Sequence, residues 1–208
     1  GTNTSIAFIN QSGDILDRFH VPSQMYSSFE AYVKEIHHQA STSSFFNQLI
    51  GIGIGAPNGN YYTGTIEFAP NLVWEGILKV KECFEKYFNV PTALTNDANA
   101  AAIGEQMFGA AKGMKNFAMI TLGTGVGSGI VVNDQMVYGA DGFAGEVGHT
   151  IVEEGGRVCG CGRKGCLETY SSVTGLKRTV IEMVQNGKAS ELKNFKIEDL
   201  SGKIIERA

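Results

Sequence analysis

Three cysteines and one histidine are the residues whose types and spacing indicate chemistry most directly. Cys159, Cys161 and Cys166 lie within a span of eight residues, and His149 precedes the first of them by ten. Three thiolates and one imidazole form a closed tetrahedral ligand set, which is typical of structural zinc. The glycines between the cysteines permit the chain reversals that ligands of one ion require. The alternatives are a disulfide with one free thiol, or three idle reduced thiols, and a reducing compartment favours the metal.

Asp97 is a second candidate, in the run Asn96-Asp97-Ala98-Asn99 that ends an expected strand and opens an expected helix. In one interpretation its carboxylate is an N-cap or first-turn group that complements the helix dipole. In the other it lies exposed at the end of a strand, where α/β folds usually bind ligands. The spacing does not choose between them. Glu146 and Glu168, which flank the cysteine-histidine segment, are further candidates, although lone carboxylates are more often solvated surface groups.

The segment 122–129 has glycine at every second position, so one side of it is bare backbone if the chain is extended. Bare N–H groups suit anionic oxygens. The spacing is not the dinucleotide fingerprint, because residues 130–132 continue as a strand where that motif requires a helix, and no Walker lysine follows. The segment is therefore either a phosphate-binding loop or a glycine-rich hairpin that binds nothing.

A mixed α/β fold has to position these groups. Alternating and apolar runs predict strands at 5–10, 15–21, 49–54, 92–95, 118–122, 130–132 and 136–138. Helical spacing predicts helices at 29–40, 77–88, 98–108, 173–186 and 197–208. The character of the sequence changes near 109–115, so we expect a small domain of residues 1–110 and part of a larger domain, with the zinc loop, in residues 111–208.

Composition and charge exclude several classes of function. The 17 Lys and Arg residues against 21 Asp and Glu residues give a net charge of -4, which leaves no basic surplus for nucleic acid. The sequence contains no apolar run of about 18 residues, the length that would predict a membrane span. Its first residues lack the charged-then-apolar pattern of a secretory signal. We therefore expect a cytoplasmic protein with no nucleic-acid partner through this segment and no membrane partner. The chain opens without Met and ends inside an expected helix, so we expect a fragment truncated at both ends.

Several blocks together resemble the ROK family of repressors, open-reading-frame proteins and kinases. The most specific block is Glu146-Val147-Gly148-His149 followed by Cys159-Gly160-Cys161-Gly162 and Gly165-Cys166-Leu167-Glu168. Further matching blocks, in the family's order, are Ala69-Pro70-Asn71-Leu72, Asn96-Asp97-Ala98-Asn99 and Leu122-Gly123-Thr124-Gly125. The resemblance covers essentially the whole chain. Within that family, the sequence is most similar to the bacterial glucokinases.

The resemblance implies an actin-like (ribonuclease H-like) two-domain sugar kinase fold. It implies a structural zinc held by His149, Cys159, Cys161 and Cys166, with the second ring nitrogen of His149 aimed at the sugar. Asp97 would be the base that activates the sugar hydroxyl toward Mg-ATP. The sugar-binding residues would be Gly55, Asn71, Asn96, Asp97, Glu146, His149 and Glu168. The residues that bind the ATP phosphates would be Gly1, Thr2, Asn3, Gly123, Thr124, Gly125 and Gly127.

The resemblance also leaves alternatives open. Glucose, converted to glucose 6-phosphate in the first step of glycolysis, is the first choice of substrate, and a homodimer is expected by analogy. A sugar-sensing transcriptional regulator, a kinase for fructose, N-acetylmannosamine or N-acetylglucosamine, and a plain zinc-stabilised binding module are the rivals. The Asp-x-Gly that the family places before Gly1 is absent, as are roughly a hundred C-terminal residues of the usual second domain.

Overall fold

The computed structural model describes residues 3–69, 72–196 and 199–207. The chain divides into two compact units. Unit 1 comprises residues 1–117 and 130–144, and unit 2 comprises residues 118–129 and 145–208. The expected division was a single cut at residue 110, whereas this division is discontinuous, so the domain boundary of the longer protein stays a prediction.

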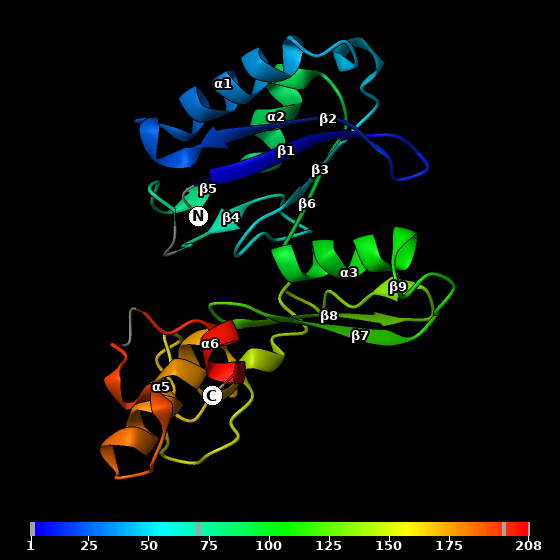
Figure 1. The fold of residues 1–208 in the computed structure, drawn as a ribbon. Coiled ribbons are helices and arrows are strands. Elements are labelled where there is room, and N and C mark those ends of the chain that lie inside the picture. Colours follow the sequence, from blue (N-terminus) through cyan, green and yellow to red (C-terminus); the bar gives the residue numbers. More distant parts are fainter. Residues whose placement is uncertain (1–2, 70–71, 197–198, 208) are drawn as a thin grey trace. The chain divides into compact units, whose positions relative to one another are not determined.

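Unit 1 is built from paired strands and three helices (Figure 1). The first sheet is an antiparallel hairpin of β1 (Asn3–Ile9) and β2 (Ile15–Pro22), and the second pairs β3 (Ile52–Gly55) in parallel with β6 (Thr92–Thr95). A third pairs β4 (Ile66–Glu67) with β5 (Ile77–Leu78). The helices are α1 (Phe29–Ser41), α2 (Val80–Phe88) and α3 (Asp97–Phe108). Short 3-10 turns lie at Ser23–Met25 and Phe46–Gln48.

The core of unit 1 lies where α1 and α2, which run side by side in Figure 1, cover the strands. Val33 and Ile36 are buried on one face of α1, as its helical spacing predicts. Leu94 from β6 is 1% exposed in the same cluster. Trp74 packs on this cluster with its ring centre 4.9 Å from that of Tyr32. Burial of these side chains holds the ends of β3 and β6 in place.

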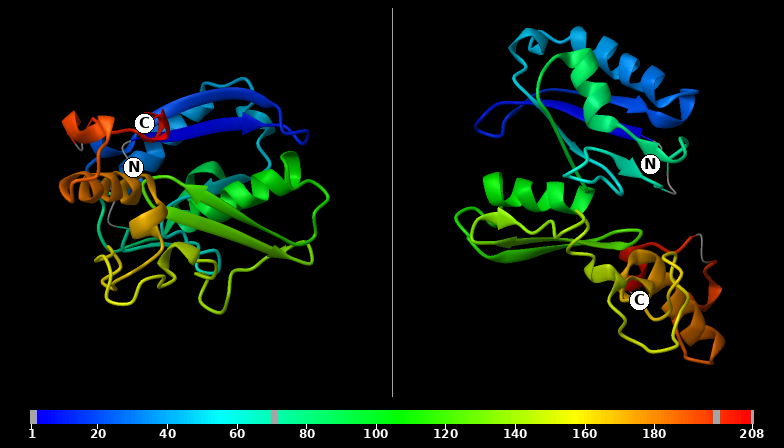
Figure 2. Two further views of the ribbon diagram at one scale, coloured as in Figure 1. Left: turned by 60° about the horizontal axis from the view of Figure 1, so that its bottom comes forward. Right: turned by 180° about the vertical axis from the view of Figure 1, so that it is seen from behind.

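The remaining sheet runs in the order β7 (Phe117–Leu122), β8 (Val126–Val132), β9 (Gln135–Met136). Unit 2 then continues through the 3-10 turn η3 (Val147–His149) and a long irregular loop, which Figure 2 shows in yellow. Its helices are α4 (Glu168–Ser171), α5 (Val173–Gln185) and α6 (Gly202–Arg207), with a 3-10 turn at Glu191–Asn194. Ser172 caps α5, since its hydroxyl accepts a hydrogen bond from the N–H of Gly175.

Most predicted elements are confirmed, and the exceptions have local causes. The predicted helix at 77–88 is wrong in its first turn, because Ile77–Leu78 pair with β4 and α2 begins at Val80. The strand predicted at 130–132 begins at Val126, inside the glycine-rich segment. The last helix, predicted at 197–208, begins only at Gly202 within the described residues, and residues 197, 198 and 208 lie outside them. Within the described ranges, no helix is long and apolar enough to cross a bilayer.

Replacing Leu94 by Ala should lower the free energy of unfolding of unit 1 by about 2–5 kcal/mol, because the substitution leaves a cavity in its core. Trp74, the single tryptophan, packs in that core, so its fluorescence during urea denaturation measures the change. Ile50→Ala is the control, since Ile50 is 80% exposed and its loss should change stability by less than about 0.5 kcal/mol. Equal effects of the two substitutions would contradict this core.

Candidate functional site

In unit 1, residues predicted to bind sugar meet where β3 and β6 end. The parallel pairing places Gly55 opposite Thr95, so the residues that follow both strands come together. A Cβ on Gly55 would lie 2.7 Å from the Cβ of Ala100 and 3.6 Å from the Cα of Asp97, so only glycine allows this approach to α3. Asn71, the remaining predicted sugar residue of this unit, lies outside the described residues.

Asn96 caps α3, and this leaves the carboxylate of Asp97 exposed. The side-chain oxygen of Asn96 accepts a hydrogen bond from the N–H of Asn99 at 2.6 Å, and Asn96 is 9% exposed. Asp97 is the first helical residue, and its Oδ1 accepts a hydrogen bond from the N–H of Ala98 at 3.0 Å. Because its neighbour supplies the cap, Asp97 retains acceptor capacity for a ligand. The N-cap interpretation of Asp97 is therefore wrong, and its first-turn position remains compatible with both roles.

Sequence reasoning missed a cluster of tyrosines beside Thr95. The rings of Tyr61 and Tyr138 stack with centroids 4.1 Å apart, and Tyr62 meets both rings at steep angles. Burial raises the pKa of the Tyr138 phenol, and the nearby Thr95 hydroxyl acts in the opposite direction. The Thr95 hydroxyl is buried and has no hydrogen-bond partner of standard geometry among the described residues. Asn60, 4% exposed, anchors the loop by accepting a hydrogen bond from the N–H of Tyr62. Two adjacent tyrosines in a polar loop were the only sign of this cluster in the sequence.

In unit 2, the four predicted zinc ligands converge. The ligand atoms of His149, Cys159, Cys161 and Cys166 all lie within 4.8 Å of one another. The sulfurs of Cys161 and Cys166 are 3.7 Å apart, and the sulfur of Cys159 is 3.5 Å from Nδ1 of His149. Zinc–sulfur bonds of about 2.3 Å give a tetrahedron with edges of about 3.8 Å. The donor types and their spacing therefore fit a zinc ion.

A glycine turn shapes this loop, and the surroundings shift the pKa values of two of its thiols in opposite directions. Gly165 has a φ of +81°, and a Cβ there would collide with the carbonyl oxygen of Glu153. Burial raises the pKa of the Cys159 thiol to about 12, whereas hydrogen bonds from Arg163, first from its backbone and then from its side chain, lower the pKa of Cys161 to about 6. A divalent cation would favour the thiolate form of each cysteine it binds.

The carboxylate of Glu168 lies between the cysteine-histidine cluster and the glycine-rich segment. Its Oε1 accepts a hydrogen bond from the thiol of Cys159 at 3.0 Å and lies 3.7 Å from Nδ1 of His149. A Cβ on Gly125 would lie only 2.7 Å from Oε2 of Glu168, so the carboxylate also faces that segment. Since Nδ1 faces the sulfurs and Glu168, the Nε2 side of His149 points elsewhere. Glu146 is exposed at the start of η3.

Three of the predicted phosphate residues form a hairpin bend. Gly123, Thr124 and Gly125 connect β7 to β8, and the N–H of Gly123 donates to the carbonyl oxygen of Gly125 at 3.0 Å. Gly127 lies within β8. Of the other predicted phosphate residues, Asn3 begins β1, whereas Gly1 and Thr2 lie outside the described residues. The bend is a glycine-rich hairpin, and a phosphate-binding role remains a prediction.

Comparison with known proteins gives one consistent family. A family model described as "ROK family" matches residues 1–206. A glucokinase from Halalkalibacterium halodurans is 40% identical over 204 residues, which is 92% of this chain and 60% of that protein. A putative xylose repressor from Caldicellulosiruptor is 37% identical over 163 residues, which is 77% of this chain and 41% of that protein. The chain thus spans less than two thirds of the glucokinase and less than half of the repressor.

A solved structure agrees. A ROK family glucokinase from Streptomyces griseus, in complex with glucose and AMPPNP, superposes with a TM-score of 0.74 at 33% identity. The match covers 97% of this chain and 66% of that one. The fold is therefore shared over nearly the whole chain.

Replacing Cys161 by Ser should remove most bound zinc, because three of four ligands bind far more weakly than the closed set. Metal analysis of the purified protein measures the zinc content. Cys83→Ser is the matched control, since Cys83 lies in α2, outside the ligand cluster. Unchanged zinc content in the Cys161 variant would refute this ligand set.

Proposed function

The chain belongs to the ROK family, and from that premise we propose that the longer protein is an ATP-dependent kinase of a hexose, with glucose as the first substrate to test. The predicted actin-like, ribonuclease H-like fold is confirmed by its structural neighbours. The observation that carries the proposal is the exposed carboxylate of Asp97, free of the capping role, at the strand ends where Gly55 and Asn96 also lie.

Asp97 is the proposed base. It would accept the proton of the sugar hydroxyl while that oxygen attacks the γ-phosphorus of Mg-ATP, the bond to the β-phosphate bridging oxygen breaks, and ADP leaves. Gly55 and Asn96, and Asn71 by position in the family, would bind the sugar from the same unit.

Other residues are proposed to bind further sugar hydroxyls and the ATP phosphates. Glu146, His149 and Glu168 would bind sugar hydroxyls, and the backbone near Gly123–Gly127 would bind ATP phosphates, with Gly1, Thr2 and Asn3 as further phosphate residues. A structural zinc would hold His149 through Nδ1 and so fix the tautomer that its other nitrogen presents. The reduced thiols that zinc requires fit a cytoplasmic protein, and a homodimer is proposed by family analogy alone.

A sugar-sensing regulator is the second candidate, because xylose repressors are among the relatives. That function needs the sugar pocket but neither a base nor a phosphate site. The presence of both Asp97 and the glycine-rich bend in this chain favours the kinase. Glucose is preferred over fructose and the N-acetylated hexosamines, since glucokinases are the relatives that match 92% and 86% of the chain, against 77% for the putative xylose repressor.

Asp97→Asn in the full-length protein should reduce kcat by about 10²–10⁴-fold, because the variant loses the proton acceptor. A coupled ADP-release assay with ATP and glucose, mannose, fructose, N-acetylglucosamine or N-acetylmannosamine measures turnover. Sugar binding, followed by calorimetry, should be largely retained. Asp134→Asn is the control, since Asp134 is an exposed turn carboxylate in unit 1.

Substantial turnover by the Asp97 variant would exclude this residue as the base. If the wild-type protein binds a sugar of the panel but phosphorylates none, the regulator becomes the supported function.

A further inference from the structure

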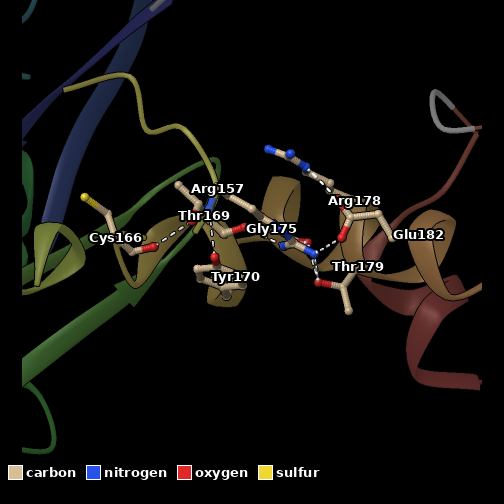
Figure 3. A network of polar contacts seen from close by, with 8 residues as sticks. All are labelled: Arg157, Cys166, Thr169, Tyr170, Gly175, Arg178, Thr179 and Glu182. Atoms are coloured by element: carbon tan, nitrogen blue, oxygen red, sulfur yellow. Dashed lines mark hydrogen bonds and ion pairs between the residues drawn. The ribbon is translucent and has the colours of Figure 1, made fainter. Parts of the chain in front are cut away.

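Arg157 is nearly enclosed although it belongs to the irregular loop that carries the cysteines (Figure 3). Its side chain is only 10% exposed. Nη1 donates to the carbonyl oxygens of Thr169 and Gly175 at 2.7 and 3.2 Å, and Nη2 donates to Thr179 Oγ1 at 2.9 Å and Glu182 Oε2 at 2.6 Å. The planar guanidinium thus serves four acceptors at once, which a lysine ammonium on a flexible stem cannot reproduce.

Tyr170 is held by the same arginine in two ways. The guanidinium carbon of Arg157 lies 4.6 Å from the centre of the Tyr170 ring, which is cation–π geometry. The backbone N–H of Arg157 donates to the Tyr170 hydroxyl at 2.9 Å. The tyrosine therefore cannot rotate or shift without breaking contacts at both ends of its side chain.

These contacts act on α4, which begins with Glu168. The helix has four residues, too few for internal hydrogen bonds to fix its direction. Thr169 and Tyr170 directly follow Glu168, so Arg157 holds the two residues next to it from one side. On its other side, Glu168 contacts Cys159 and faces Gly125.

We propose that Arg157 is a positioning residue of the sugar site: through Thr169 and Tyr170 it fixes the direction in which Glu168 presents its carboxylate. This rests on the proposed function, in which Glu168 binds a sugar hydroxyl. The hydrogen bonds and the ring contact of the Arg157 side chain within the described residues run to α4 and α5, and α4 is the helix that carries Glu168, so its effect on the sugar passes through α4.

The surroundings of Arg157 allow a specific test by chemical rescue. An open hollow of about 430 Å³ borders the network and is lined by Glu153, Gly156, Arg157, Tyr170, Arg178 and Glu182. In Arg157→Ala, guanidinium from solution can enter through this hollow and occupy the place of the lost side chain. Rescue of that kind restores position, whereas it does not repair a protein that has lost its fold.

Arg157→Ala in the full-length protein should weaken glucose binding by about tenfold or more, the usual size of an effect on a residue that orients a ligand group. Calorimetry gives the Kd, and metal analysis should show unchanged zinc. A non-denaturing concentration of guanidinium chloride should restore much of the affinity, while sodium chloride at the same concentration should not. kcat should change much less than KM, since Asp97 is untouched.

Arg178→Ala is the matched control. Arg178 also pairs with Glu182, with Nε 2.9 Å from Oε1, but its side chain is 48% exposed. The glucose affinity of the Arg178→Ala variant should therefore stay close to that of the wild type. If Arg157→Ala does not fold, Arg157→Lys takes its place, with weakened glucose binding expected at a near-normal melting temperature.

Unchanged glucose affinity in a folded Arg157 variant, equal losses in the Arg178 control, or an affinity loss that guanidinium does not reverse in Arg157→Ala would each overturn the positioning role. Those results would leave the proposed kinase standing. A wild-type protein that binds no sugar of the panel would overturn both proposals.

Discussion

Unit 2 depends on one geometric requirement: three sulfurs and one imidazole from a loop of little regular structure must meet within 4.8 Å. Irregular chain has many alternative conformations, and ordering it costs about 1–2 kcal/mol per residue. A bound zinc ion would supply, through tetrahedral ligation, a large and directional stabilisation that helices and strands do not provide in this stretch. The glycine turn at Gly165 and the enclosed guanidinium of Arg157 act in the same sense, since each removes freedom from the loop or its neighbours.

Unit 1 reaches comparable order by ordinary packing. There the polar residues follow β3 and β6, and the direction of those strands is fixed by parallel pairing and by the buried side chains of α1 and α2. Backbone register alone places Gly55 opposite Thr95. The two units therefore hold polar groups in two ways: unit 1 uses regular elements with an apolar core, and unit 2 uses an irregular loop whose ligand cluster a metal ion would cross-link.

The sequence predicted the regular elements and the ligand cluster better than it predicted the contacts between distant residues. Helical spacing and alternation were enough for α1, α3 and the opening hairpin, and the cysteine spacing was enough for the ligand cluster. The first turn of α2 was misassigned because Ile77 and Leu78 fit a helix by apolar spacing, and only the partner strand β4 decides otherwise. The roles of Arg157 and of the tyrosine cluster could not be predicted from the sequence for a related reason, because their partners are distant along the chain. In the sequence alone, an arginine or tyrosine in a polar loop looks the same whether it is buried or solvated.

The separation of the cap from the carboxylate at the start of α3 has an evolutionary consequence. Asn96 supplies the cap of the helix, so Asp97 contributes to the local fold only through one hydrogen bond with the N–H of Ala98 and through its charge in the first turn. A lineage can therefore lose or regain the carboxylate by single substitutions without passing through an unstable intermediate. Such neutrality at the level of folding offers a simple route by which catalysts and sensors diverge from one ancestral scaffold, each keeping the pocket of the other.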